Sequence, residues 1–216
     1  MTAPFDLEET DRLLSTTRAV RKRLDLDRPV EREVLEECIQ LSQQAPTGSN
    51  NQGWRWLIVR DPSRRKKLAD LYRAVGEEYL REAARDLDQA DPQTRRVYGS
   101  ALYLLENLEK VPVHVIPCLL GRLPDDAPAG MQAGFWGSIF PAVWSFQLAL
   151  RSRGLGSALT TIHLGRADEA AELLGIPDTV TQAGLLPVAY TVGTEFKVAA
   201  RRPAREITYW DGWKQS

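Results

Sequence analysis

Cysteine and histidine are scarce in this sequence, and their scarcity argues against several kinds of site. The chain holds two cysteines, Cys38 and Cys118, and two histidines, His114 and His163. Two thiols inside apolar stretches provide neither a disulfide framework nor a set of thiolate metal ligands, so we expect a reducing, cytoplasmic compartment. Both histidines lie in or beside apolar segments, where we expect a structural rather than a catalytic role.

The motifs of hydrolases and of common nucleotide-binding enzymes are missing as well. The sequence contains no G-x-S-x-G, no H-E-x-x-H and no P-loop, and no G-x-G-x-x-G follows a candidate strand. Nothing therefore supports a catalytic triad, a metal site or a Rossmann dinucleotide site. The remaining possibility is a cofactor bound without these fingerprints.

Neither sign of charge is in excess, and no apolar run is long. Lysine and arginine total 28 against 29 aspartate and glutamate, for a net charge of −1, so the molecule lacks the field that nucleic-acid binding needs. Residues 1–11 carry acids, unlike a secretion signal. The longest apolar segment, residues 135–150, is interrupted by polar residues and glycine and is shorter than the roughly 20 residues of a membrane span. We expect a soluble protein without nucleic-acid or membrane partners.

The order of apolar patterns predicts one α/β domain over residues 1–216, since the sequence has no repeat and no linker-like segment. Apolar residues at helical spacing predict helices between Pro29 and Pro46 and over residues 68–79, 97–108, 135–153 and 167–174. Aliphatic and aromatic runs predict strands at residues 54–59, 111–120, 157–162 and 185–192, and polar stretches predict loops at 46–53 and 121–134.

Two apolar segments are expected to pack in unusual ways. The helix over residues 135–153 is apolar on most sides, which indicates a position in the middle of the structure or at an interface. The tail, residues 201–213, is rich in aromatic residues and therefore needs a surface to pack against. Either the chain's own core or a partner subunit would serve.

Two polar segments could bind an anionic, flat cofactor. Arg18 and Arg21 lie three residues apart and would converge on one anion if they formed a helical turn, although such a pair is more often a solvated surface. Residues 45–52 supply six side chains or bare amides, more than a polar turn requires and suited to a heterocycle with alternating donors and acceptors.

Together these segments resemble the FMN-dependent nitroreductase family. The resemblance begins with residues 17–21 (TRAVR) and 45–56 (APTGSNNQGWRW) and continues in the same order through 154–161 (GLGSALTT), 174–177 (LGIP), 186–190 (LPVAY) and 201–203 (RRP). Each segment is a weak signal by itself. Their order and spacing over residues 17–213 make the resemblance specific.

The resemblance implies an α/β fold with a mixed, mostly antiparallel sheet of four to five strands flanked by helices. It also implies a homodimer that interlocks through a long central helix and exchanged C-terminal segments, with two FMN sites at the interface. The residues implied in FMN binding are Arg18, Ala19, Val20, Arg21, Pro46, Thr47, Gly48, Ser49, Asn50, Gln52, Leu159, Thr160, Thr161, Arg201 and Arg202.

By the same resemblance, Arg18, Arg21 and one of Arg201 and Arg202 would hold the FMN phosphate and the polar edge of the ring, with Arg21 at the pyrimidine edge. Residues 46–52 would contact ribityl and ring atoms, and the backbone amides of residues 159–161 would face the central ring nitrogen. Many members have a serine where this chain has Ala19. Arg201 is slightly favoured over Arg202 for the phosphate.

The implied activity is transfer of electrons from NADH or NADPH, through FMN in a ping-pong cycle, to a nitroaromatic, a quinone or a related small molecule. Phe135 or Trp136 would stack near the ring, on a substrate face formed by residues 87–98 and 123–136. The sequence leaves open the choice of NADH or NADPH, a deazaflavin in place of FMN, and the acceptor. It also leaves open dehalogenation, ring dehydrogenation, flavin breakdown and flavin binding without turnover.

Overall fold

The computed structural model describes residues 4–85 and 91–213, which divide into two compact units. The larger unit is residues 18–194, and the smaller one is formed by the two ends of the chain, up to Thr17 and from Glu195 onward. Among the described residues, no helix is both long enough and apolar enough to cross a membrane.

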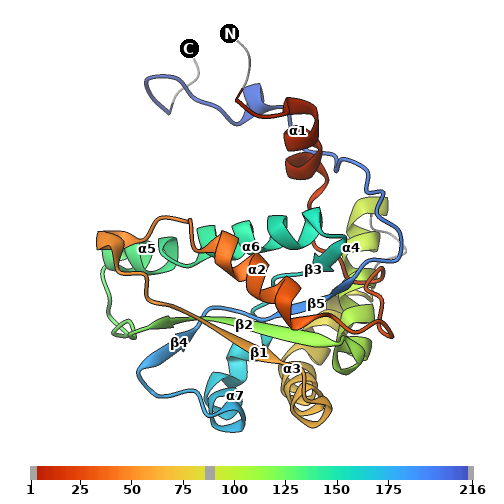
Figure 1. The fold of residues 1–216 in the computed structure, drawn as a ribbon, viewed down its shortest axis with the longest axis vertical. Helices are drawn as coiled ribbons and strands as arrows, with labels where there is room; N and C mark the ends of the chain where they lie inside the picture. The colour runs from red at the N-terminus through yellow and green to blue at the C-terminus, as the bar shows by residue number, and fades with distance from the viewer. Residues whose placement is uncertain (1–3, 86–90, 214–216) are drawn as a thin grey trace. The chain divides into compact units, whose positions relative to one another are not determined.

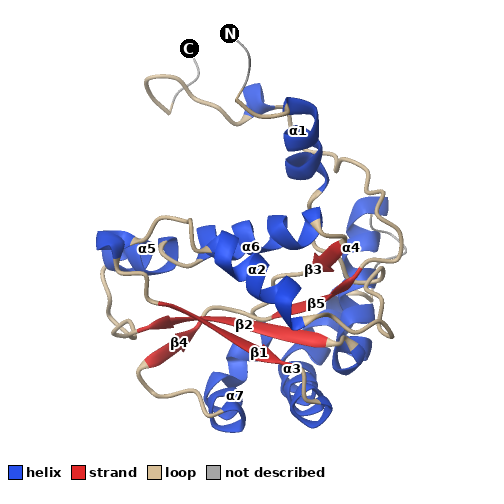
Figure 2. Ribbon diagram, viewed as in Figure 1, coloured by secondary structure: helices blue, strands red, loops and turns tan. Residues whose placement is uncertain are grey.

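The larger unit is built on an antiparallel sheet, in which five strands are found among the described residues (Figures 1 and 2). The order is β1-β2-β5-β3, and β4 pairs with the end of β2 on the same side as β5. Strand β2 is buried along seven of its eight residues, as its aliphatic run predicts. The strands are β1 (Trp54–Val59), β2 (Val113–Leu120), β3 (Leu155–Ser157), β4 (Val180–Gln182) and β5 (Leu186–Tyr190).

Helices cover both faces of this sheet, which confirms the predicted layered arrangement (Figure 2). Helices α2 (Arg32–Ser42), α5 (Ala129–Gly137) and α6 (Phe140–Ser152) lie on one face, and α3 (Pro62–Ala83) and α7 (Ala167–Leu174) lie on the other. Helix α4 (Pro92–Asn107) packs against α3. The core between α2, α6 and the sheet contains the fully buried Phe146 and Leu150 of α6.

The helix ends follow from local sequence. Asp61 and Asp91 cap α3 and α4 by accepting backbone N–H bonds, and each is followed by a proline, whose fixed φ suits the first helical turn. Helix α7 ends at Gly175, which adopts φ +68° in the left-handed region. The predicted strand at residues 54–59 and helix at residues 167–174 are confirmed with these bounds.

The prediction of one helix over residues 135–153 is wrong. Two helices, α5 and α6, meet at Ser138 and Ile139, and α5 already begins at Ala129 inside the predicted loop. Pro141 gives the reason, because it has no N–H for the preceding turn and its ring would clash with the carbonyl of residue 137. An apolar run therefore contains a helix break that its hydropathy does not show.

The prediction of a strand at residues 157–162 is also wrong in its bounds. Strand β3 ends at Ser157, and beyond it a single bridge joins Thr160 to Leu185 before a 3-10 turn begins at Ile162. Strand β4 and the N-terminal helix α1 (Leu7–Thr16) were not predicted at all. Three-residue strands such as β3 and β4 are too short to show a period of two.

The smaller unit contains α1 and the C-terminal tail. Asp6 caps α1, and a 3-10 turn at Ala204–Glu206 begins the tail. The rings of Tyr209 and Trp213 stack with their centroids 4.6 Å apart. The side chains of Trp210 and Trp213 are nonetheless 81% and 82% exposed, so this unit offers them no core of its own.

Candidate functional site

The first predicted motif forms no helix, and main-chain hydrogen bonds hold the chain around it against the sheet. The Val20 N–H donates to the Ser157 carbonyl at 2.8 Å, and the Asp25 N–H donates to the Tyr190 carbonyl at 2.8 Å. The helical turn that would let Arg18 and Arg21 converge is therefore not formed, and main-chain bonds to β3 and β5 take its place. Buried Gln147 of α6 donates to the Ser157 hydroxyl at 3.0 Å and so braces the same point from the helix layer.

Arg18 has buried polar atoms without hydrogen-bond partners among the described residues. Its Nε and one of its terminal nitrogens are buried, and neither has a hydrogen-bond partner within residues 4–85 and 91–213. Arg21 is also partly buried, and its Nη1 donates to the Ser100 hydroxyl at 3.2 Å. Burial lowers the pKa of the Arg21 guanidinium. Buried guanidinium groups are costly without an anion or acceptor, so this segment fits an anionic group.

A pocket of about 350 Å³ brings Arg21 together with part of the predicted 159–161 segment. The Thr160 N–H, which was expected to face the ring, instead donates to the Leu185 carbonyl at 3.0 Å. Thr161 is exposed and precedes the 3-10 turn. The pocket is lined by Arg21, Tyr72, Tyr79, Leu80, Gln93, Thr94, Val97, Tyr98, Ala101, Leu159, Thr160 and Ile162.

Sequence reasoning missed Tyr72. Its ring is 2% exposed and belongs to the apolar stripe of α3, yet its hydroxyl accepts a long hydrogen bond from Thr160 Oγ1, 3.4 Å away, in the pocket that Arg21 lines. A tyrosine in an apolar stripe indicates packing, and only the fold places its hydroxyl beside the Thr160 side chain.

The second predicted motif, the loop before β1, lies elsewhere in the unit. The Gly48 N–H donates to the Ser138 hydroxyl at 3.0 Å, at the break between α5 and α6. Within the loop, Gln52 donates through its N–H to Thr47 Oγ1 at 3.1 Å and through Nε2 to Asn50 Oδ1 at 2.9 Å. Pro46, Gly48, Ser49, Asn50 and Gln52 are exposed, whereas Thr47 is half-buried.

The backbone of this loop is strained. Ser49, Asn50 and Gln52 have φ of +53°, +54° and +48°, in the left-handed region that disfavours side chains other than glycine, although asparagine tolerates it better. Strain of this kind gathers at binding sites, where the surroundings fix the backbone for a ligand. The loop is therefore a second candidate contact surface.

The predicted substrate residues lie near the same loop. Phe135 and Trp136 end α5, with ring centroids 5.1 Å apart, and Trp136 stacks with Phe140 at 5.8 Å. Both are partly buried and pack on the core of the larger unit. Of the predicted substrate face, residues 87–90 lie outside the described residues, while Gln93, Thr94, Val97 and Tyr98 line the Arg21 pocket.

One chain does not bring these groups to one place. Ser157 shares a row of the sheet with Val113, and Gly53, at the end of the loop, bonds to Leu120. These rows are seven residues apart on β2, or roughly 23 Å at 3.3 Å per residue. The motifs also flank β3 and β1, the opposite edges of the sheet. Arg201 and Arg202 belong to the smaller unit, where both are exposed.

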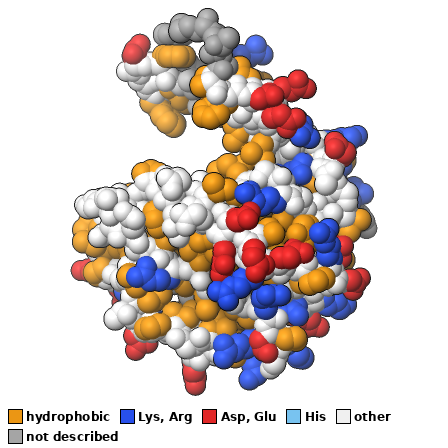
Figure 3. Space-filling view, viewed as in Figure 1, with side chains coloured by type: hydrophobic (Ala, Val, Ile, Leu, Met, Phe, Trp, Pro, Cys, Tyr) orange, Lys and Arg blue, Asp and Glu red, His pale blue; other side chains and the backbone are white. Residues whose placement is uncertain are grey.

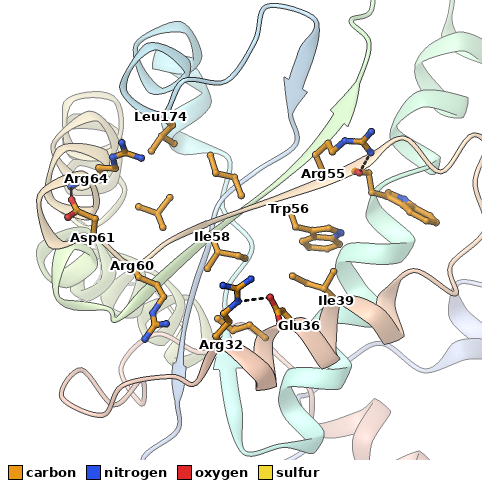
Figure 4. Close-up of a pocket in the computed structure, with 14 residues that line it drawn as sticks. Arg32, Glu36, Ile39, Arg55, Trp56, Ile58, Arg60, Asp61, Arg64 and Leu174 are labelled. Carbon is orange, nitrogen blue, oxygen red and sulfur yellow. Dashed lines mark hydrogen bonds and ion pairs between the residues drawn. The ribbon is translucent and has the colours of Figure 1, made fainter.

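A larger groove of about 750 Å³ follows the free edge of β1 (Figure 4). The side chains of Leu35, Ile39, Trp56 and Ile58 give it an apolar wall, and Arg32 and Glu36 pair at 2.7 Å beside them. The Trp56 indole N–H is buried without a hydrogen-bond partner among the described residues. The face of the molecule that Figure 3 shows carries acidic and basic side chains side by side, with apolar side chains between them.

The comparisons with known proteins agree with this fold. A family model described as "Nitroreductase family" matches residues 14–190. A protein of Thermus thermophilus described as an NADH dehydrogenase is 25% identical, over 94% of this chain and all of its own. Solved structures with the same fold include the FMN and NADPH-dependent nitroreductase NfnB of sphigopyxis sp. strain HMH, with 19% identity, coverage of 97% and 100% of the two chains and a TM-score of 0.68. Another is an iodotyrosine deiodinase bound to FMN and 3-iodo-L-tyrosine, with 23% identity, coverage of 93% and 98% and a TM-score of 0.64.

Proposed function

The chain belongs to the nitroreductase family, a family of flavin-dependent oxidoreductases, and from this premise we propose that it binds FMN and works as a homodimer. Its reductant would be NADH or NADPH, and its acceptor a nitroaromatic, a quinone or a related small molecule. The observation that carries the proposal is Arg18, whose two buried guanidinium nitrogens have no partner among the described residues.

Arg18 would bind the FMN phosphate, because a guanidinium fork makes paired, charge-assisted bonds to phosphate oxygens. Ala19 has no hydroxyl for the phosphate and the Val20 N–H is bonded to Ser157, so the Arg18 side chain would carry this contact. Arg201 or Arg202 would add a second cation, with Arg201 slightly favoured.

Arg21 would hold the pyrimidine edge of the ring in the pocket that it shares with Leu159 and Thr160. FMN supplies the redox chemistry when it is bound, taking electrons from the nicotinamide and passing them to the acceptor in turn. The cationic Arg21 favours negative charge at that edge, and the apolar pocket wall keeps water away from it. The side chains of Phe135 and Trp136 would shape the acceptor side.

A second copy of the chain would complete each site. Within one chain the Arg18–Arg21 segment and the 46–52 loop lie at opposite edges of the sheet, too far apart to hold one ring. In a twofold dimer, the Arg18–Arg21 segment of each copy would face the 46–52 loop of the other copy. Pro46, Thr47, Gly48, Ser49, Asn50 and Gln52 of one copy would then meet FMN held by the Arg18 segment of the other.

The exchanged C-terminal segment would occupy the groove along β1. By the alternation of an antiparallel ladder, the backbone groups of Trp56 and Ile58 point away from β2 and are available to an added strand. The unpartnered Trp56 indole N–H needs an acceptor in the same groove (Figure 4). The exposed apolar side chains of the tail, Ile207 and Trp210 among them, need burial. With its tail packed in this way, each chain, residues 1–216, would form a single domain of the dimer. We expect the dimer in the cytoplasm.

The test is the near-ultraviolet and visible absorbance of the purified protein, followed by NADH or NADPH without oxygen. Flavin bands that bleach, and that return with a quinone, support the proposed enzyme. If the bands bleach but no quinone or nitroaromatic restores them, the protein catalyses another reaction known for this fold. If neither nucleotide bleaches the bands, the protein is a flavin carrier. If FMN does not bind even after incubation, the proposal is wrong.

The dimer has its own test. Sedimentation of the full chain should give a dimer, and removal of the residues after Arg202 should give a weaker dimer or a monomer. Val198→Ala, which shortens an exposed apolar side chain before the cut, is the control and should leave the dimer intact. A truncated chain that stays fully dimeric would contradict the exchange.

A further inference from the structure

Three residues that line the Arg21 pocket, Ile162, Thr160 and Tyr72, are linked by two successive hydrogen bonds, each donated toward Tyr72. The Ile162 N–H donates to Thr160 Oγ1 at 3.5 Å, and Thr160 Oγ1 donates to the Tyr72 hydroxyl at 3.4 Å. Both bonds are long. In this arrangement the Tyr72 hydroxyl accepts from Thr160, and it donates no hydrogen bond to a described residue.

Arg21 faces the same space from the sheet edge. It lines the pocket with Tyr72 and Thr160, and the proximity of its cation to Tyr72 opposes the rise in the pKa of Tyr72 that burial causes. Among the described residues that line the pocket, none carries a carboxylate. The polar corner therefore offers a cation and a phenol proton, which together suit a ligand edge made of acceptor atoms.

Resting on the proposed function, we infer that Tyr72 is a further FMN-binding residue: its hydroxyl, oriented by Thr160, donates to the acceptor edge of the ring that Arg21 holds. Thr160 is then a positioning residue that acts through Tyr72. A chain of aligned donors strengthens its last bond, and a buried tyrosine hydroxyl is expected to have a partner.

Packing alone would account for the Tyr72 ring but not for its hydroxyl. The ring is almost fully buried on α3, and phenylalanine would fill the same space. The hydroxyl lies 3.4 Å from Thr160 Oγ1, and both residues line the pocket of about 350 Å³ with Arg21. Tyr72→Phe therefore separates the two roles, because it keeps the ring and removes the donor.

The experiment compares FMN affinity, the midpoint potential of bound FMN and the unfolding midpoint without FMN. In Tyr72→Phe we expect affinity to fall about fivefold, as for one neutral hydrogen bond. The midpoint potential should become more negative in the variant, because the Tyr72 donor stabilises the electron-rich reduced ring and the variant lacks this donor. The unfolding midpoint without FMN should change little. Tyr103→Phe, which removes a hydroxyl outside the pocket, is the matched control and should match the wild type.

Thr160 provides an independent variant. Thr160→Val should weaken FMN binding, Thr160→Ser should restore it, and the Tyr72→Phe/Thr160→Val double variant should bind as Tyr72→Phe does, because both changes remove the same contact. Additive losses would overturn the positioning role of Thr160. Wild-type affinity and potential in Tyr72→Phe would overturn the inference and leave the proposed function standing. If the wild type binds no FMN, both are overturned.

Discussion

Gly156 lies against Val20 so closely that a Cβ on Gly156 would come within 2.9 Å of the Val20 Cβ and within 2.7 Å of Thr191 Cγ2. This contact lets the Arg18–Arg21 segment bond to the backbone of β3. Gly156, which belongs to the predicted flavin segment, therefore has a packing role: its lack of a side chain lets the backbone that carries Arg18 and Arg21 lie close to β3.

Gly156→Ala should lower the free energy of unfolding by about 1–3 kcal/mol, because the added methyl overpacks this contact. Urea unfolding at fixed protein concentration measures it. Gly130→Ala is the matched control, since a Cβ at Gly130 in α5 meets nothing within 4 Å and should leave stability equal or slightly higher. Equal stability of the wild type and Gly156→Ala would show that Val20 can move aside.

Arg18→Ala should weaken FMN binding about 10- to 100-fold, the size expected for charge-assisted hydrogen bonds. Riboflavin, which lacks the phosphate, should bind the variant as it binds the wild type. Titration of both flavins by fluorescence separates the phosphate contact from ring contacts. Arg28→Ala, at an exposed arginine further along the same segment, should change neither affinity. Equal losses for FMN and riboflavin would remove the phosphate assignment.

Stability should fall in mild acid because of two buried histidines. Burial lowers the pKa of His114 and of His163 from 6.5 to about 4. Between these values the unfolded chain binds protons that the folded chain does not, so the stability that the neutral histidines contribute is fully present above pH 6.5 and is lost as the pH falls below it. Each histidine contributes a slope of up to about 1.4 kcal/mol per pH unit.

His163→Gln isolates this effect from the exposed carboxylates. Its unfolding free energy should decline less steeply between pH 6.5 and pH 4 than that of the wild type. Carboxylate titrations are common to both proteins and cancel in the difference. Parallel pH profiles would mean that His163 titrates normally in the folded protein.

The two thiols should be unreactive in the folded protein. Burial raises the pKa of Cys38 to about 11 and that of Cys118 to about 12, so almost no thiolate forms at neutral pH. A chromogenic disulfide reagent at pH 8 should label neither cysteine until denaturant is added, and then label both. Rapid labelling of Cys118 would show that β2 opens locally.

The sequence alone determined the family and most of the framework. Order and spacing of the motifs from residue 17 onward identified the family, and β1, β2, α7 and β5 were visible because their apolar runs are bounded by prolines, glycines or aspartates. It did not show the break at Ser138, because the hydropathy of residues 135–153 continues across Pro141.

Tertiary structure decided where the site groups lie. Arg18 and Arg21 would converge if they formed a helical turn, but main-chain bonds to Ser157 and Tyr190 hold the chain around them in another conformation. Strand pairing separates that segment from the 46–52 loop, and packing of α3 turns the Tyr72 hydroxyl toward Thr160. These relations join residues tens of positions apart, and local patterns report only on neighbours within a few turns or one strand.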